Sequence, residues 1–171
     1  MSYDEPIGQA ASCLVHEADA AGLTCACAES CTGGLVSGAI TAVSGSSGVL
    51  RGGVVSYAVG VKHDVLGVDS AILDDPALGA VSAECAEQMC VGAARLLKAD
   101  VAVSVTGIAG PTGAEPGKPV GTVWFGLCVG GSARSQLCHF EGSRDEVRGQ
   151  AVLHALGLLR EGVAELSGKG E

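Results

Sequence analysis

Apolar positions along the chain follow two alternating periods, which predict alternating helices and strands. Apolar residues three and four positions apart predict helices over about residues 7–21, 35–43, 61–66, 82–98 and from 143 onwards. Short apolar runs predict strands at about residues 23–27, 52–59, 100–106, 122–129 and 135–140. The run at 100–106 is continuously apolar except at Ser104, which is expected for a strand covered on both faces. This order of elements predicts a single three-layer α/β/α domain with a mixed sheet, spanning residues 1–171.

Three local signals fix the ends of these elements. Ser82 is placed to cap the helix that follows it, and residues 143–146 (SRDE) form a capping box that opens the last helix. Gly130-Gly131 predicts a tight hairpin between the last two strands. Residues 167–171 are expected to fray.

Charge and composition narrow the classes of partner. The chain has 10 Lys and Arg against 19 Asp and Glu, a formal net charge of −9, which argues against a nucleic-acid surface. A small anionic molecule stays possible, because it needs only local donors. No apolar run is long enough to cross a bilayer, and the first twelve residues lack the apolar core of a signal peptide. None of the 8 cysteines forms a C-x-x-C pair or has histidines at zinc spacing, so we expect a cytoplasmic protein with reduced thiols and no metal.

Residues 28–34 (AESCTGG) are the stretch in which reactive groups are densest. They join a predicted strand to a predicted helix and contain two hydroxyls, a thiol and two glycines. The N–H groups and positive dipole end at the start of a helix suit an anion, or an oxygen that becomes an anion during a reaction. A simpler interpretation is also open, in which Thr32 only caps the helix while Gly33 and Gly34 allow close packing.

Ser30 and Lys62 are the candidate nucleophile and base. A serine needs a base, and a desolvated lysine with a lowered pKa can serve. Cys31 competes as nucleophile and His63 as base, but as immediate neighbours of Ser30 and Lys62 they should point elsewhere. Tyr57 can orient the lysine or stack on a flat ring.

Other polar groups lie in loops or on the last helix. The loop around Ser46 can wrap a phosphate or be a plain connection, and no Walker A or G-x-G-x-x-G motif lies in a suitable strand–helix context. A long glycine-rich loop follows Thr106, as functional loops often do. Arg144 and Arg148 are one helical turn apart and could share an anion, or form a solvated helix face.

Taken together, these segments resemble a known family. Residues 28–34 (AESCTGG), 57–62 (YAVGVK), 105–111 (VTGIAGP), 118–123 (KPVGTV) and 143–148 (SRDEVR) occur in the order seen in the C-terminal domain of the competence/damage-inducible protein CinA. The resemblance runs from the first helix to the last. The stand-alone form of that domain is nicotinamide mononucleotide deamidase.

The resemblance implies hydrolysis of the carboxamide of nicotinamide mononucleotide to nicotinate mononucleotide and ammonia, without cofactor or metal. It implies a homo-oligomer, dimer or higher, whose partner is a small nucleotide and neither nucleic acid nor membrane. The implied catalytic residues are Ser30, Lys62, Tyr57 and Thr106. The predicted substrate-binding residues are Thr32, Gly33, Gly34, Ser46, Gly107, Gly110, Arg144 and Arg148.

One position departs from the pattern. Where the family usually has an asparagine two residues after the tyrosine, this chain has Val59. The departure keeps two alternatives open: a non-catalytic nucleotide-binding or regulatory domain on the same fold, and an amidohydrolase for another carboxamide.

Overall fold

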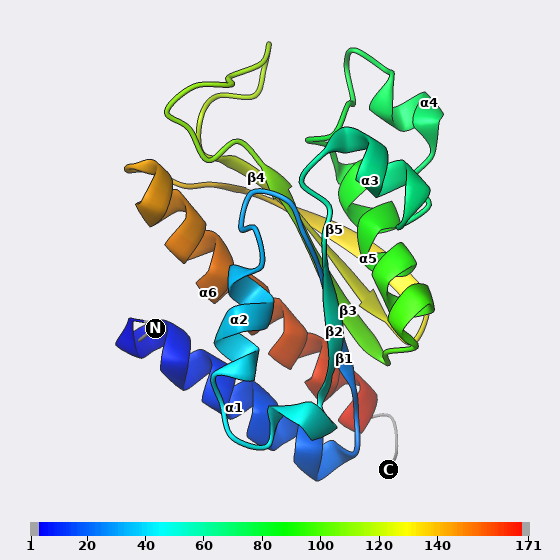
Figure 1. The fold of residues 1–171 in the computed structure, drawn as a ribbon, viewed down its shortest axis with the longest axis vertical. Coiled ribbons are helices and arrows are strands. Elements are labelled where there is room, and N and C mark those ends of the chain that lie inside the picture. Colours follow the sequence, from blue (N-terminus) through cyan, green and yellow to red (C-terminus); the bar gives the residue numbers. More distant parts are fainter. Residues whose placement is uncertain (1–3, 169–171) are drawn as a thin grey trace.

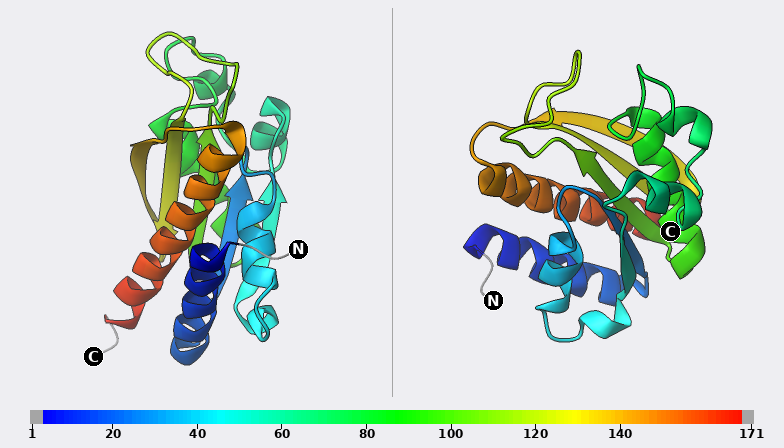
Figure 2. Two further views of the ribbon diagram at one scale, coloured as in Figure 1. Left: turned by 90° about the vertical axis from the view of Figure 1, so that its left-hand side faces the viewer. Right: turned by 45° about the horizontal axis from the view of Figure 1, so that its top comes forward.

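A five-stranded mixed sheet organises the molecule, and the computed structural model describes residues 4–168 of it (Figures 1 and 2). The strands are β1 (Cys25–Glu29), β2 (Leu50–Val55), β3 (Val101–Gly107), β4 (Thr122–Val129) and β5 (Ser132–His139). They lie in the order β2-β1-β3-β4-β5. β1 is parallel to β2 and β3, whereas β3–β4 and β4–β5 are antiparallel.

Helices cover both faces of this sheet, which confirms the predicted three-layer α/β/α fold. They are α1 (Glu5–Ala21), α2 (Leu35–Thr41), α3 (Val59–Asp64), α4 (Ser70–Leu73), α5 (Ala83–Leu97) and α6 (Arg144–Ser167), with a short 3₁₀ turn, η1 (Ser46–Gly48). α1, α2 and α6 pack together on one face, and α5 packs on the other with α4 against it (Figure 1). No helix within residues 4–168 combines the length and the apolarity that a membrane crossing requires.

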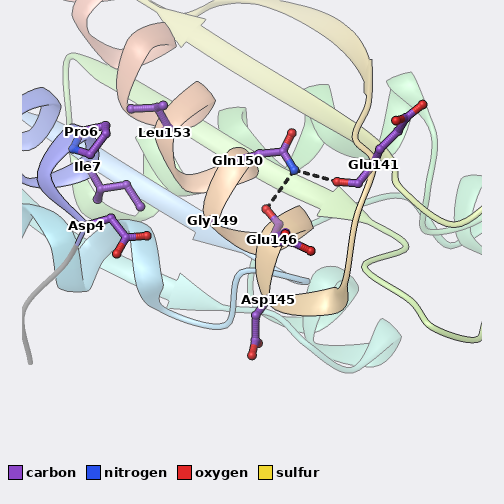
Figure 3. Close-up of a pocket in the computed structure, with 9 residues that line it drawn as sticks. All are labelled: Asp4, Pro6, Ile7, Glu141, Asp145, Glu146, Gly149, Gln150 and Leu153. Carbon is purple, nitrogen blue, oxygen red and sulfur yellow. Dashed lines mark hydrogen bonds between the residues drawn. The ribbon is translucent and has the colours of Figure 1, made fainter.

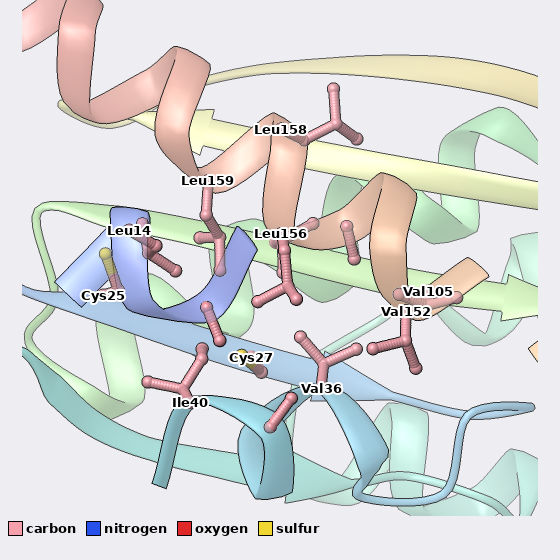
Figure 4. Close-up of a cluster of buried hydrophobic side chains, with 14 of the residues drawn as sticks. Leu14, Cys25, Cys27, Val36, Ile40, Val105, Val152, Leu156, Leu158 and Leu159 are labelled. Carbon is pink, nitrogen blue, oxygen red and sulfur yellow. The ribbon is translucent and has the colours of Figure 1, made fainter. Parts of the chain in front are cut away.

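The core is divided by the sheet into two parts. The larger part lies under α1, α2 and α6, where Leu14, Leu156 and Leu159 are fully buried against β1 and β3 (Figure 4). The smaller part lies under α5 and includes Met89 and Leu66. Full burial of each large apolar side chain contributes about 1.5–3 kcal/mol, so the packing holds the sheet rigid beneath its loops.

The capping predictions are confirmed and several boundaries change. The Ser82 hydroxyl accepts a hydrogen bond from the Cys85 amide, and Ser143 with Glu146 forms a complete capping box. The second strand ends at Val55 rather than 59, because α3 already begins at Val59. η1 and α4 were not predicted, since each is a single short turn. α6 reaches Ser167, and the expectation of fraying at 169–171 lies outside the described residues.

Candidate active site

The carboxyl ends of three parallel strands converge at one edge of the sheet. Ser30 follows β1, and its amide donates to the Val105 carbonyl of β3 at 2.9 Å. Ser56 follows β2, and its amide donates to the Glu29 carbonyl at 2.8 Å. The residues that leave these strands are therefore held side by side, at the edge where open α/β sheets place their sites.

A tight turn carries Ser30 from β1 towards α2. The Gly33 amide donates to the Ser30 carbonyl at 3.1 Å. Gly33 and Gly34 have φ angles of 62° and 97°, a region that side chains rarely tolerate, so the turn requires glycine here. Gly34 is the N-cap of α2 and no side chain caps the helix at that position. The interpretation of Thr32 as the cap is therefore wrong, and its buried hydroxyl has no hydrogen-bond partner among residues 4–168.

The N-terminus of α2 is occupied by the chain's own Glu29. This fully buried carboxylate accepts hydrogen bonds from the amides of Gly34 (2.9 Å), Val36 (3.0 Å) and Ser37 (2.9 Å) and from the Ser37 hydroxyl (2.7 Å). The prediction that the Gly34 N–H binds a substrate anion is wrong, because Glu29 already uses it. The signal available in the sequence was a carboxylate at the end of an otherwise apolar strand.

Ser30 and Lys62 are brought together from β1 and α3. Lys62 Nζ lies 3.0 Å from Ser30 Oγ and donates to the Ser56 carbonyl oxygen at 2.6 Å. Lys62 is only 1% exposed. Burial lowers the pKa of Lys62, and the nearby thiols Cys85 and Cys31 oppose this shift only in part. A neutral amine beside a serine hydroxyl can accept its proton.

The two competing residues point elsewhere or are unreactive. Burial raises the pKa of the Cys31 thiol to about 11, although Lys62 and two arginines act in the opposite direction. A thiol near a helix N-terminus can be acidified, but for Cys31 desolvation outweighs that effect. His63 turns away, with Nδ1 2.8 Å from the Val68 carbonyl oxygen.

Arg144, the first residue of α6, links two loops at this edge. It donates to the Tyr57 hydroxyl at 3.0 Å and to the Gly110 carbonyl at 2.9 Å. Tyr57 is 61% exposed. The structure thus brings the exposed residues Tyr57 and Arg144 together beside the buried Gly110.

Arg148 binds a different partner, the turn after β1. Its Nε donates to the Cys31 carbonyl at 3.1 Å and its Nη2 to the Thr32 carbonyl at 3.2 Å. Of the two alternatives for these arginines, a shared anion is not supported, since Arg148 is committed to backbone carbonyls.

The remaining predicted residues have structural contacts or lie elsewhere. The buried Thr106 hydroxyl donates to the Ala80 carbonyl at 2.6 Å, and Gly107 pairs with Val123 of β4. Ser46 lies in η1, which precedes β2, at the amino ends of the parallel strands. The length of β1 separates it from Ser30, roughly 16 Å at strand rise. The predicted grouping of Ser46 with the other site residues is wrong, because its loop connects to the opposite edge of the sheet.

A groove of about 520 Å³ between α1 and α6 is lined by other residues (Figure 3). Its lining includes the carboxylates of Asp4, Glu141, Asp145 and Glu146 and none of the predicted site residues. An acidic lining repels a phosphate, so we do not assign the nucleotide to this groove.

Within residues 4–168, no three His, Cys, Asp or Glu side chains are grouped so that they could hold a metal ion.

The fold and this edge define an α/β protein with a serine beside a buried lysine at the carboxyl ends of its parallel strands. A sequence model of the CinA C-terminal domain matches residues 8–163. The chain belongs to this family.

Relatives within the family differ in length. The chain is 47% identical over 131 residues to nicotinamide-nucleotide amidohydrolase PncC of Enterobacter agglomerans, covering 76% of this chain and 79% of that protein. It is 48% identical over 139 residues to a CinA-like protein of Citrifermentans bemidjiense, covering 81% of this chain and 33% of that one. The chain thus spans about a third of the CinA-like relatives it matches.

Solved structures share the fold. A competence/damage-inducible protein of Agrobacterium tumefaciens has a TM-score of 0.88 at 38% identity, covering 93% of this chain and 96% of that one. A CinA superfamily protein of Klebsiella pneumoniae has a TM-score of 0.87 at 34% identity, covering 93% and 98%.

Proposed function

We propose that this protein is an amidohydrolase that converts nicotinamide mononucleotide to nicotinate mononucleotide and ammonia, with Ser30 as nucleophile and Lys62 as base. The observation that carries the proposal is the 3.0 Å contact between Ser30 Oγ and a buried Lys62 Nζ. The likeness to PncC over most of both chains supports the choice of substrate.

The proposed reaction has two stages, in which Ser30 is first acylated and the resulting ester is then hydrolysed. Neutral Lys62 takes the Ser30 proton while Ser30 Oγ forms a bond to the amide carbon. The tetrahedral intermediate then expels ammonia, which receives the proton from Lys62. Water attacks the resulting ester, giving its proton to Lys62, and the acid product leaves as Ser30 regains a proton. The Ser56 carbonyl orients the amine by accepting one of its hydrogens.

The oxyanion needs donors beside Ser30. Gly33 and Gly34 amides are already bonded to Ser30 and Glu29, whereas the amides of Cys31 and Thr32 have no acceptor within the described chain. These two N–H groups are the donors we assign to the oxyanion, each worth about 3–4 kcal/mol in known hydrolases. Arg144 and Tyr57 contact each other at the same edge of the sheet, and we assign them to the nucleotide.

Ammonia release from nicotinamide mononucleotide tests the proposal. We expect turnover in the wild-type protein and none in Ser30→Ala, with Cys31→Ala retaining most activity. Nicotinamide riboside and free nicotinamide in the same assay separate a nucleotide amidohydrolase from an enzyme for another carboxamide. Binding of the nucleotide without ammonia release would overturn the enzymatic proposal in favour of a regulatory domain.

A further inference from the structure

The turn that carries Ser30 is held by α6 through two successive carbonyl groups. Arg148 donates from Nε to Cys31 and from Nη2 to Thr32, at 3.1 and 3.2 Å. Its remaining terminal nitrogen lies 3.6 Å from the Asp145 carboxylate, and its side chain is 26% exposed. Because the guanidinium is planar and its donors are fixed, this fork sets the orientation of two peptide planes at once.

The orientation of these planes determines where their N–H groups point. In a trans peptide the C=O and N–H point in opposite directions. The Cys31 carbonyl shares its peptide with the Thr32 N–H, which therefore points away from Arg148. The Thr32 carbonyl shares its peptide with the Gly33 N–H, which closes the turn onto the Ser30 carbonyl. Arg148 thus leaves the Thr32 N–H unused and directed away from α6.

A cation on a carbonyl oxygen also changes the donor at the other end of the peptide. It draws electron density towards the oxygen and makes the N–H a stronger donor, as in any polarised hydrogen-bond chain. We propose that Arg148 is a positioning residue that orients and polarises the Thr32 N–H for the oxyanion formed when Ser30 attacks a carbonyl. This proposal rests on the proposed function for the substrate, for Ser30 as the nucleophile and for the Thr32 N–H as an oxyanion donor.

The test compares Arg148→Met and Arg148→Lys with Arg160→Met in the full chain. Arg160 is a matched control, because it lies on the same helix and binds Glu17 with two of its nitrogens at the molecular surface. Two rates are measured for each variant: ammonia release from nicotinamide mononucleotide, and labelling of Ser30 by a fluorophosphonate, followed by peptide mass spectrometry. The second reaction also develops charge on an oxygen but does not require the nucleotide.

We expect Arg148→Met to lower kcat and the labelling rate by about 10- to 100-fold, less than for outright loss of an oxyanion donor. KM should change by less than about 3-fold, because ground-state binding is not affected. Guanidinium chloride at low millimolar concentration should restore part of both rates, and Arg160→Met should match the wild type. Arg148→Lys should stay impaired, since a lysine lacks the fork.

Equal labelling rates in wild type and Arg148→Met would overturn the inference. If Arg148→Met does not fold, a wild-type labelling rate in Arg148→Lys would overturn it instead. Wild-type protein that releases no ammonia but shows Arg148-dependent labelling would refute the substrate and support the inference. Ammonia release together with a labelling rate that does not depend on Arg148 would support the substrate and overturn the inference.

Discussion

Glu29 and Lys62 are both buried at the same edge of the sheet, yet their surroundings differ. The Glu29 carboxylate receives four hydrogen bonds from α2. Lys62 Nζ has two oxygen neighbours, the Ser56 carbonyl and the Ser30 hydroxyl, and no carboxylate partner within residues 4–168. A buried charge that is fully paired anchors structure, whereas one that is incompletely paired gives up its charge and becomes a base.

Removing the base should have the largest effect. Lys62→Met is expected to lower kcat for ammonia release by about 10²–10⁴-fold, the usual contribution of a general base. The fold should persist, because methionine fills the space without a desolvation cost. Steady-state kinetics and thermal unfolding measure the two quantities. His63→Ala is the control, and a comparable loss there would make His63 the base instead.

Removing the charge of Glu29 should lower the stability of the folded protein. Glu29→Gln places an amide donor against the donors of α2, and we expect the free energy of unfolding to fall by about 2–4 kcal/mol. Urea denaturation measures it. Glu17→Gln, which disrupts an exposed pair with Arg160, should cost less than about 1 kcal/mol. Equal losses in the two variants would contradict the anchoring role of Glu29.

Arg144 and Tyr57 should contribute less than the base. Arg144→Met removes the bonds to the Tyr57 hydroxyl and the Gly110 carbonyl, and we expect KM to rise about 10-fold with a smaller change in kcat. Tyr57→Phe, which removes only one of these bonds, should raise KM about 3-fold. An unchanged KM in both variants would show that the nucleotide binds elsewhere.

Ser46 should contribute least. Because η1 lies at the opposite edge of the sheet, Ser46→Ala is expected to change kcat/KM by less than about 2-fold. The same assay that follows Ser30→Ala measures it. A loss of ten-fold or more would mean that the substrate reaches the far edge.

Much of the fold could be predicted from the chain alone, because local patterns determined it. The apolar run of β3, the Ser82 cap and the capping box at Ser143 each specify an element without long-range information. Element boundaries near 55–59 were less predictable, since the chain turns there under the constraint of neighbouring strands.

The candidate site was predictable only in part. The positions of Ser30 and Lys62 follow from strand–turn–helix motifs, but their contact joins residues 32 positions apart. The roles of Glu29 and Arg148 depend on which backbone groups are left free after folding, which no spacing in the chain reveals. The prediction for Ser46 was wrong because the sequence of a polar loop does not reveal at which edge of the sheet the loop lies.

The pH dependence of kcat/KM for ammonia release tests the central claim that neutral Lys62 takes the Ser30 proton. A base must be deprotonated to accept a proton, and burial lowers the pKa of Lys62, so this form is reached at a lower pH than for an ordinary lysine. We predict that kcat/KM rises with pH and reaches a plateau above an apparent pKa. This apparent pKa should be lower than the ordinary pKa of a lysine. In Lys62→Met this rise should disappear from the residual activity. The same rise at the same pKa in Lys62→Met would contradict the account.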